Sequence, residues 1–256
     1  MNIRDYNREA WDKQVEKGNA WTRPVSSQVI ANARRGDWSV LLTEQKPVPR
    51  EWFGDVLGKD ILCLASGGGQ QAPTLAAAGA KVTVLDNSPL QLAQDRLVAE
   101  REGLTLTTIE GDARDLSMLA NESFDIIFHP VSNVFIPEVR PVWQEAFRVL
   151  RHGGVLLAGF MNPAFYLFTS DAQDGKAPLV VTNSLPYSHV NDLSKTELEK
   201  LMIEGLPLEH SHTLSDQIGG QVDAGFLLTA MYETRHSDAA LSRYMPTYIA
   251  TRVVKP

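Results

Sequence analysis

Ile61-Leu62-Cys63-Leu64-Ala65-Ser66-Gly67-Gly68-Gly69 is the stretch that decides the fold, together with Val82-Thr83-Val84-Leu85-Asp86 further along the chain. Each apolar run predicts a buried strand, and the first ends in three glycines while the second ends in an acid. Glycine lets the backbone turn sharply and approach a ligand, because no Cβ stands in the way. An acid at the end of the next strand can accept hydrogen bonds from two ribose hydroxyls. The pair of strands therefore predicts a site for an adenosine-bearing cofactor at the carboxyl edge of a parallel sheet.

The composition limits the class of protein. The chain has 256 residues, of which 43% are hydrophobic, so it can bury the core of one large α/β domain or two small ones. Its net charge of −7 argues against a general affinity for nucleic acid or anionic membranes, because both need a basic face. Cys63 is the single cysteine, which excludes an internal disulfide and a cysteine cluster for zinc. We find no signal peptide and no apolar run near the ~18 residues of a membrane span, so we expect a cytoplasmic protein without a membrane partner.

From residue 60 onward, apolar runs and helical patterns alternate. Strands are expected at residues 61–64, 81–85, 105–109, 124–128 and 155–160, the last behind a turn at Arg151-His152-Gly153-Gly154. Helices are expected between them at residues 73–78, 89–102 and 138–150, and Ser88-Pro89-Leu90-Gln91 opens one of them as a capping box. Such alternation predicts a doubly wound, mostly parallel α/β sheet with its ligand crevice at the carboxyl ends of the strands.

The segments on either side of this core are less regular. Helices are expected at residues 3–17 and 26–35, and a proline-containing insertion at residues 161–190. A capping box at Ser194 and Glu197 opens another helix, a weaker helix covers residues 214–224, and strands at 226–232 and 247–254 form an antiparallel pair. We predict one domain over residues 1–256, made of an N-terminal lid (1–59), a cofactor-binding core (60–160), an insertion that caps the substrate site (161–213), and a terminal helix and strand pair (214–256).

Two families of cofactor fit the glycine turn. The segment Gly67-Gly68-Gly69-Gln70-Gln71-Ala72 matches the dinucleotide pattern G-x-G-x-x-A, which is a weak signal by itself. The same turn resembles motif I of the class I S-adenosylmethionine-dependent methyltransferases, in which a hydrophobic strand leads into an x-G-x-G-x-G turn.

Three further segments favour the methyltransferase resemblance. They are Gly111-Asp112-Ala113 after the third strand, Ser123-Phe124-Asp125-Ile126-Ile127-Phe128, and Phe147-Arg148-Val149-Leu150-Arg151-His152-Gly153-Gly154-Val155-Leu156-Leu157, which resembles the family's R-V-L-K-P-G-G turn. The resemblance implies a seven-stranded sheet with an antiparallel terminal pair, S-adenosyl-L-methionine as cofactor, and methyl transfer. A non-catalytic S-adenosylmethionine-binding protein and a nicotinamide-dependent oxidoreductase remain as alternatives.

Two positions depart from the family pattern. Cys63 and Ala65 stand where motif I normally has an acid and a glycine. The missing acid removes a usual partner of the cofactor's methionine ammonium, and Gln70 or Gln71 could replace it. Cys63 is more simply a buried strand residue. Ala65 permits the close turn if its φ stays negative.

The resemblance implies a role for each matched residue. The loop amides and the following helix N-terminus contact the methionine end of the cofactor. Asp86 holds the ribose hydroxyls, Asn87 lies against adenine, and Asp112 receives the adenine amino group. The full set of predicted cofactor-binding residues is Ala65, Ser66, Gly67, Gly68, Gly69, Gln70, Asp86, Asn87, Gln91, Asp112, Ala113 and His129.

Methyl transfer needs in-line alignment and, for a hydroxyl or protonated amine, a base. His129 follows the fourth strand, where the methyl group should emerge, and is the first base candidate, with His212 the second. An alternative is that His129 only packs beside the cofactor. The acceptor is expected to be a small molecule methylated at oxygen or nitrogen rather than at carbon or sulfur. The segment His129-Pro130-Val131-Ser132 lacks the N-P-P-Y or D-P-P-Y signature of nucleobase amino methylation, so nucleic acid is not expected.

Residues outside the core are expected to close the site. Tyr6, Trp11 and Trp21 are predicted to form the lid, or else to dock the N-terminal segment on the core. Asn133, Tyr187 and His189 are predicted to line the acceptor pocket, and no metal is expected, because the spacing of the late histidines matches no recognised ligand pattern. Gly219-Gly220 inside a helix costs about 2 kcal/mol relative to alanines, which suggests close packing or a ligand wall. The sequence leaves the acceptor's identity and the oligomeric state open.

Overall fold

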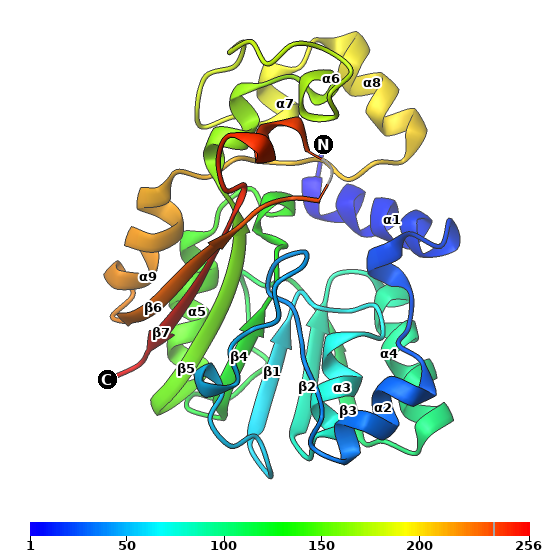
Figure 1. Cartoon of the computed structure of the whole chain (residues 1–256), viewed down its shortest axis with the longest axis vertical. Helices are drawn as coiled ribbons and strands as arrows, with labels where there is room; N and C mark the ends of the chain where they lie inside the picture. The colour runs from blue at the N-terminus through cyan, green and yellow to red at the C-terminus, as the bar shows by residue number, and fades with distance from the viewer. Residues whose placement is uncertain (238) are drawn as a thin grey trace.

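The computed structural model describes residues 1–237 and 239–256, which fold around one seven-stranded sheet (Figure 1). The strand order is β3-β2-β1-β4-β5-β7-β6, in which β1 to β5 run parallel and β7 is antiparallel to both of its neighbours. This confirms the predicted doubly wound sheet with an antiparallel terminal pair. The strands are β1 (Asp60–Leu64), β2 (Lys81–Asp86), β3 (Leu106–Glu110), β4 (Phe124–His129), β5 (Leu150–Met161), β6 (Leu227–Thr234) and β7 (Tyr248–Val254).

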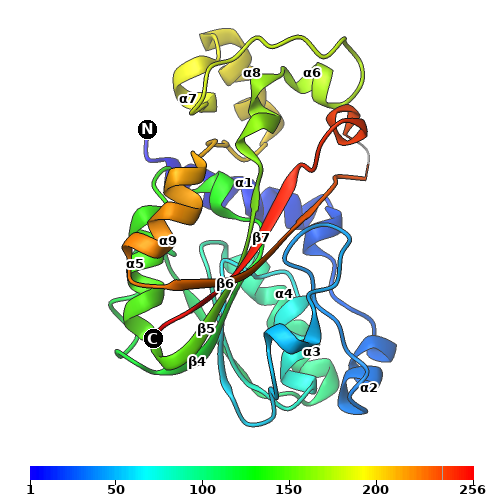
Figure 2. The same cartoon turned by 60° about the vertical axis from the view of Figure 1, so that its left-hand side comes forward.

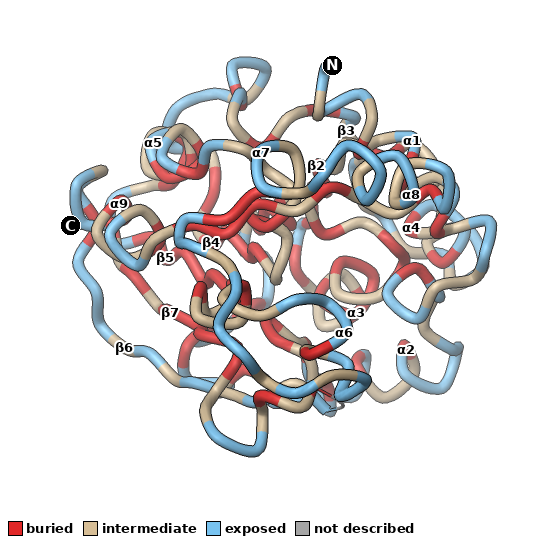
Figure 3. The backbone as a smooth tube through the Cα atoms, turned by 90° about the horizontal axis from the view of Figure 1, so that it is seen from above, coloured by how far each residue is buried: buried red, intermediate tan, exposed pale blue. Residues whose placement is uncertain are grey.

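Helices cover both faces of the sheet because successive side chains of each strand point to opposite faces. Ile61 and Cys63 of β1 join the core under the helices on one side, whereas Leu62 and Leu64 join the core under α5 on the other. Figure 3 shows the buried backbone concentrated along the central strands. The helices are α1 (Ile3–Glu16), α2 (Ser27–Arg34), α3 (Gln71–Ala77), α4 (Pro89–Glu102), α5 (Arg140–Val149), α6 (Ser170–Gln173), α7 (His189–Asp192), α8 (Lys195–Glu204) and α9 (Gly220–Asp223).

Helices α6, α7 and α8 form a cap above the carboxyl edge of the sheet, and α1 runs between this cap and the core (Figures 1 and 2). On the core side, Asp12 of α1 accepts hydrogen bonds from the Ser88 hydroxyl at 2.6 Å and the Leu90 amide at 3.2 Å. On the cap side, α1 contacts main-chain atoms of residues 204–208. These contacts are hydrogen bonds from side chains of α1 and of Lys17, which follows it. Tyr6 binds the Leu206 carbonyl, Asn7 the Leu208 amide and carbonyl, Gln14 the Gly205 carbonyl, and Lys17 the Glu204 carbonyl.

Two elements differ from their predicted form. Strand β5 already begins at Leu150 and includes the predicted turn, so Phe124 pairs with Leu150 while Ile126 pairs with Val155, and the residues between them bulge. The predicted helix over 214–224 opens with a π-helical turn, Ser215–Gly219, before α9. The Trp143 indole donates a hydrogen bond to the Asp216 carbonyl in that turn at 2.9 Å. A side chain that takes a helix carbonyl in this way is a recognised cause of such irregularity.

Among the described residues, no helix combines the length and apolar character that crossing a membrane requires.

Candidate active site

A cavity of about 1080 Å³ lies at the carboxyl edge of the sheet, between the core and the cap. Its cofactor end is lined by Ala65, Ser66, Gly67, Gln70, Asp86, Asn87, Gln91, Gly111, Asp112, Ala113 and Arg114. Its other end, which we call the aromatic end, is lined by Phe135, Phe165, Tyr166, Phe168, Tyr187 and Tyr248 with several carboxylates. Pockets for a single ligand seldom exceed roughly 1,000 Å³, so the cavity has room for a cofactor and an acceptor together.

Asp86 ends β2 and reaches the glycine turn after β1. Its Oδ2 accepts a hydrogen bond from the Gly67 amide and its Oδ1 one from the Ser88 amide, both at 2.9 Å. A Cβ at residue 67 would lie 2.7 Å from the Gln91 Cβ and 3.1 Å from the Asp86 Oδ2, so only glycine fits between them. Burial raises the pKa of the Asp86 carboxyl, although the backbone hydrogen bonds act against this. The turn and the predicted ribose acid thus lie in direct contact.

Asp95 of α4 holds the rest of the glycine turn, and the sequence interpretation did not include it. Its carboxylate is fully buried and accepts hydrogen bonds from the Gly68 amide at 3.2 Å and the Gly69 amide at 3.1 Å. Burial, and then the charge of Asp86, raise the pKa of Asp95 well above its ordinary value. A signal was present in the sequence. Asp95 lies between Leu92 and Val98 on the buried face of the helix, where an unpaired acid calls for a partner.

Cys63 and Ala65, the two departures from the family pattern, lie in different environments. Cys63 is fully buried in the sheet core, as the simpler interpretation expected, and burial followed by the charge of Asp95 raises the pKa of its thiol. Ala65 has a φ of +47°, so the expectation of a negative φ is wrong. Its amide donates to the Leu85 carbonyl at 2.7 Å, which ties this residue into the left-handed turn. Alanine there costs roughly 1–2 kcal/mol that glycine would avoid.

The residues of the cofactor end fit a bound S-adenosylmethionine. The two predicted ammonium partners are committed to the N-terminal segment, because Gln70 donates to the Ala20 and Arg23 carbonyls and Gln71 accepts from the Leu41 amide. By contrast, the Ser66 hydroxyl and the Gln91 amide oxygen are buried and have no hydrogen-bond partner within the described residues. Buried polar atoms are normally satisfied, so these two mark where a polar ligand belongs.

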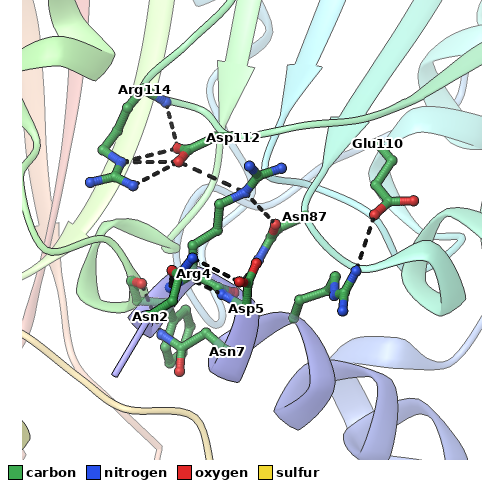
Figure 4. A network of polar contacts seen from close by, with 10 residues as sticks. Asn2, Arg4, Asp5, Asn7, Asn87, Glu110, Asp112 and Arg114 are labelled. Atoms are coloured by element: carbon green, nitrogen blue, oxygen red, sulfur yellow. Dashed lines mark hydrogen bonds and ion pairs between the residues drawn. The ribbon is translucent and has the colours of Figure 1, made fainter.

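Helix α1 closes the side of the cofactor end where adenine is predicted to lie (Figure 4). The Asn87 Oδ1 accepts from the Arg4 Nε at 3.1 Å, and the Asn87 Nδ2 donates to the Arg4 carbonyl at 2.8 Å. The Arg4 Nε also lies 3.9 Å from the Asp112 Oδ2. Arg114 forms an ion pair with Asp112 at 2.7 Å. Burial acts to raise the pKa of Asp112, but the hydrogen bonds from Arg114 and the charges of Arg114 and Arg4 hold this pKa below its ordinary value. The sequence interpretation missed Arg4 and Arg114.

The structure places the two base candidates beneath the cavity wall. His129 is fully buried, with Nδ1 2.8 Å from the Leu64 carbonyl and Nε2 2.7 Å from the Asn133 Oδ1, and burial lowers its pKa. The His212 Nε2 lies 3.0 Å from the Asn133 carbonyl, and Asn133 also donates to Gln217. None of His129, Asn133 and His212 lines the cavity. In this arrangement the His129 ring joins β1, β4 and the turn after β4, and neither proposed base faces the cavity.

The predicted lid and acceptor residues divide in a similar way. Trp11 and Trp21 line the cavity, and the Trp11 ring packs edge-on against Phe135 at 5.0 Å. Tyr6 does not line it, and its hydroxyl instead docks α1 on the cap through the Leu206 carbonyl at 2.9 Å. Tyr187 and His189 line the aromatic end, and their contact with an acceptor stays a prediction. Over residues 1–237 and 239–256, no group of three or more His, Cys, Asp or Glu side chains is arranged to hold a metal ion.

Comparison with known proteins identifies the family. A family model for a methyltransferase domain matches residues 62–158. The chain is 51% identical over 250 residues to the uncharacterized methyltransferase YbaJ of Bacillus subtilis strain 168. The aligned region covers 98% of this chain and 97% of that protein. Among solved structures, it resembles an S-adenosylmethionine-dependent methyltransferase from Mesorhizobium loti, with a TM-score of 0.58 and 18% identity over 80% of this chain and 94% of the other. A SAM-dependent methyltransferase from Methanosarcina mazei gives a TM-score of 0.60 and 16% identity over 81% and 98% of the two chains. Sheet order, glycine turn and relatives agree, and the chain belongs to the class I S-adenosylmethionine-dependent methyltransferase family.

Proposed function

We propose that the protein transfers the methyl group of S-adenosylmethionine, bound at the cofactor end of the cavity, to a small-molecule acceptor held at the aromatic end. The observation that carries this is the continuity of one cavity from the Asp86 side of the sheet to Tyr166 and Tyr187 in the cap. Oxygen or nitrogen is the proposed acceptor atom, and a cytoplasmic location belongs to the same proposal.

Each residue of the cofactor end has a proposed task. Asp86 holds the ribose hydroxyls, and Asn87 and Asp112 contact the adenine. Ser66 and Gln91 supply polar contacts for the rest of the cofactor, because their side chains are buried and unpartnered. When bound, S-adenosylmethionine supplies a methyl group on a positively charged sulfur that a nucleophile can attack. The protein contributes alignment and exclusion of water, for which α1 and the cap provide the walls.

Replacement of Asp86 by alanine tests the cofactor assignment. The loss of a carboxylate that binds two hydroxyls should raise the Kd for S-adenosylmethionine at least about tenfold, since a hydrogen bond to a charged group contributes about 1.5–3 kcal/mol. The measurement is calorimetric titration of purified protein. Glu110→Ala is the matched control, because Glu110 is the register partner of Asp86 at the end of β3 and does not line the cavity. An unchanged Kd in Asp86→Ala, with the control also unchanged, would remove Asp86 from the site.

Catalysis itself is tested by incubating the protein with methyl-labelled S-adenosylmethionine and a metabolite extract. The proposal expects label to appear in a small molecule. Cofactor that is bound but never turned over would support a binding protein instead.

A further inference from the structure

We propose that the aromatic end of the cavity selects an acceptor that carries an amine beside an apolar body, with the ammonium form paired to Glu209. The inference rests on the proposed function, because it names the acceptor class for the same cavity. It is carried by the contacts of Glu209, by the aromatic walls around it, and by the balance of charge along the cavity.

Glu209 is a carboxylate without a cationic partner. Its Oε2 accepts a hydrogen bond from the Tyr166 hydroxyl at 2.7 Å, and within the described residues no Lys or Arg forms an ion pair with it and its Oε1 has no hydrogen-bond partner. Its carboxylate therefore lines the cavity with the Tyr166 hydroxyl as a neutral hydrogen-bond partner. The His189 ring is also near, and its pKa is lowered by burial although the charge of Glu209 acts against this. A carboxylate left in this state favours a ligand that brings a positive charge or a donor.

Three tyrosines surround this carboxylate. The rings of Tyr166 and Tyr187 stack with centroids 5.9 Å apart, and both line the cavity together with Tyr248. Burial and neighbouring carboxylates, Glu209 among them, raise the pKa of all three hydroxyls, that of Tyr187 to about 12. The hydroxyls therefore stay neutral, and the ring faces offer the negative quadrupole that attracts ammonium groups.

Charge along the cavity points the same way. Outside the cofactor end, seven carboxylates and two lysines line the wall, namely Glu44, Asp171, Asp174, Asp192, Glu197, Glu204 and Glu209 against Lys176 and Lys200. Lys176 is bound to Asp174 at 2.7 Å, and Glu44 already pairs with His236 at 3.6 Å. Burial lowers the pKa of the nearby His189, which keeps that ring neutral. A carboxylate or phosphate acceptor would be repelled here, whereas an amine is complemented.

The rest of the aromatic end is apolar. Val131, Val134, Phe135, Met161 and Phe165 belong to or pack against one hydrophobic cluster with Tyr166, Tyr187 and Tyr248. These side chains can bury the apolar body of the acceptor while Glu209 holds its amine. Together they predict a ligand with one cationic group on an aromatic or branched apolar frame.

Three probes of similar size and different charge test this inference: phenethylamine, 2-phenylethanol and phenylacetate. Each is titrated by calorimetry into full-length protein saturated with S-adenosylhomocysteine. We expect phenethylamine to bind at least about tenfold more tightly than the alcohol, with a Kd of about 1 mM for so small a probe, and phenylacetate not to bind. Glu209→Gln should abolish the preference for the amine and leave the affinity for the alcohol unchanged. Glu199→Gln on the exposed side of α8 is the matched control and should change neither affinity.

The outcomes separate the two proposals. If S-adenosylhomocysteine itself does not bind, the proposed function fails. If it binds but phenethylamine binds no better than 2-phenylethanol, or does not bind at all, only the amine inference is overturned. A Glu209→Gln protein that is folded by circular dichroism and keeps the amine preference overturns it as well. The series on the unmodified protein decides the question even if that variant does not fold.

Discussion

Asp95 illustrates, at the scale of single residues, how a buried carboxylate can shape a loop that lines a cavity. Its two oxygens accept the amides of Gly68 and Gly69, so they fix the second half of the turn while Asp86 fixes the first. The two acids lie close enough for the charge of Asp86 to raise the pKa of Asp95. Asp95 thus orders the glycine turn from behind, because its carboxylate does not line the cavity.

The raised pKa of Asp95 predicts a particular dependence of stability on pH. Above the ordinary value of 3.8, the unfolded chain has lost this proton while the folded protein still holds it, so Asp95 lowers the free energy of unfolding as pH rises through this window. The Asn side chain of Asp95→Asn cannot ionise. The free energy of unfolding of the unmodified protein should therefore fall, relative to that of this variant, as pH rises from 3.8. Urea denaturation over a pH series measures it.

Asp112→Asn is the control of opposite sign. The pKa of Asp112 is lowered, so its contribution to stability is present above 3.8 and is lost as pH falls through the lower folded value. For each variant, the free energy of unfolding relative to the unmodified protein is plotted against pH. If the two plots have slopes of the same sign, the assignment of a raised pKa to Asp95 is wrong.

The local pattern placed Gly67, Asp86 and Asp112 at the ends of predicted strands, where all three line the cavity, because apolar runs and the turns that end them are visible in nearby sequence. It did not predict Arg4, whose partner Asn87 lies 83 residues away, or Asp95, whose glycine partners lie 26 and 27 residues away. Glu209 meets Tyr166 across 43 residues. Such partnerships depend on how elements pack, and no local spacing contains that information.

At the scale of elements, Gly219 and Gly220, at the junction between the π-helical turn and α9, differ in how closely their backbone is packed. A Cβ at Gly220 would lie 2.8 Å from the Trp143 Cδ1, whereas a Cβ at Gly219 would meet nothing within 4 Å. Both residues have helical dihedral angles. The sequence interpretation of this pair as a site of close packing thus holds for one of its two members.

Single alanine substitutions at these positions should act in opposite directions. Gly219→Ala should raise the free energy of unfolding by about 0.5–1 kcal/mol, because alanine loses less backbone entropy in a helix. Gly220→Ala should lower it by about 1–3 kcal/mol, because the added methyl displaces Trp143 of α5. Urea denaturation of the two variants beside the unmodified protein measures both values. Stabilisation of similar size in both variants would show that Trp143 does not constrain residue 220.

The elements themselves were largely predictable, because apolar runs and capping boxes report burial and helix starts directly. The capping box of α8 is present with both of its hydrogen bonds, and Gly103 and Gly205 end α4 and α8 in the left-handed conformation. The bulge in β5 was not predictable. Locally, Gly153-Gly154 has the composition of a turn, and only its position beside β4 and β7 keeps the chain in the sheet.

At the scale of the whole molecule, a ligand that spans core and lid should stabilise the entire fold. At a hundredfold excess over its Kd, S-adenosylhomocysteine should add about 2.7 kcal/mol to the free energy of unfolding, which raises the Tm by about 5–10 °C for a chain of this size. Differential scanning fluorimetry measures the shift. NAD at the same concentration is the control and should leave the Tm unchanged, whereas a shift with NAD alone would favour the nicotinamide alternative.

Part of the N-terminal segment that is predicted to form the lid belongs to the core. Ile30 and Ala33 of α2 are buried in the main hydrophobic cluster, so removal of residues 1–36 would take away core packing along with the lid. Lid function is better tested through α1 alone, since α1 carries the contacts with both the cap and the cofactor end.

The hydrogen bonds between α1 and the cap have a consequence for which mutations this protein can tolerate. At that junction, the side-chain hydrogen bonds of Tyr6, Asn7, Gln14 and Lys17 reach only peptide groups of residues 204–208. All amino acids present the same carbonyl, and all except proline present the same N–H. Mutations of the neighbouring side chains can therefore leave these hydrogen bonds in place, except at Gly205, where a Cβ would lie 2.8 Å from the Lys13 Cδ and φ is +66°. Under the proposed function, point mutations of Leu206 or Glu204, which line the cavity, could therefore alter the acceptor site while the junction between α1 and the cap keeps the same hydrogen bonds.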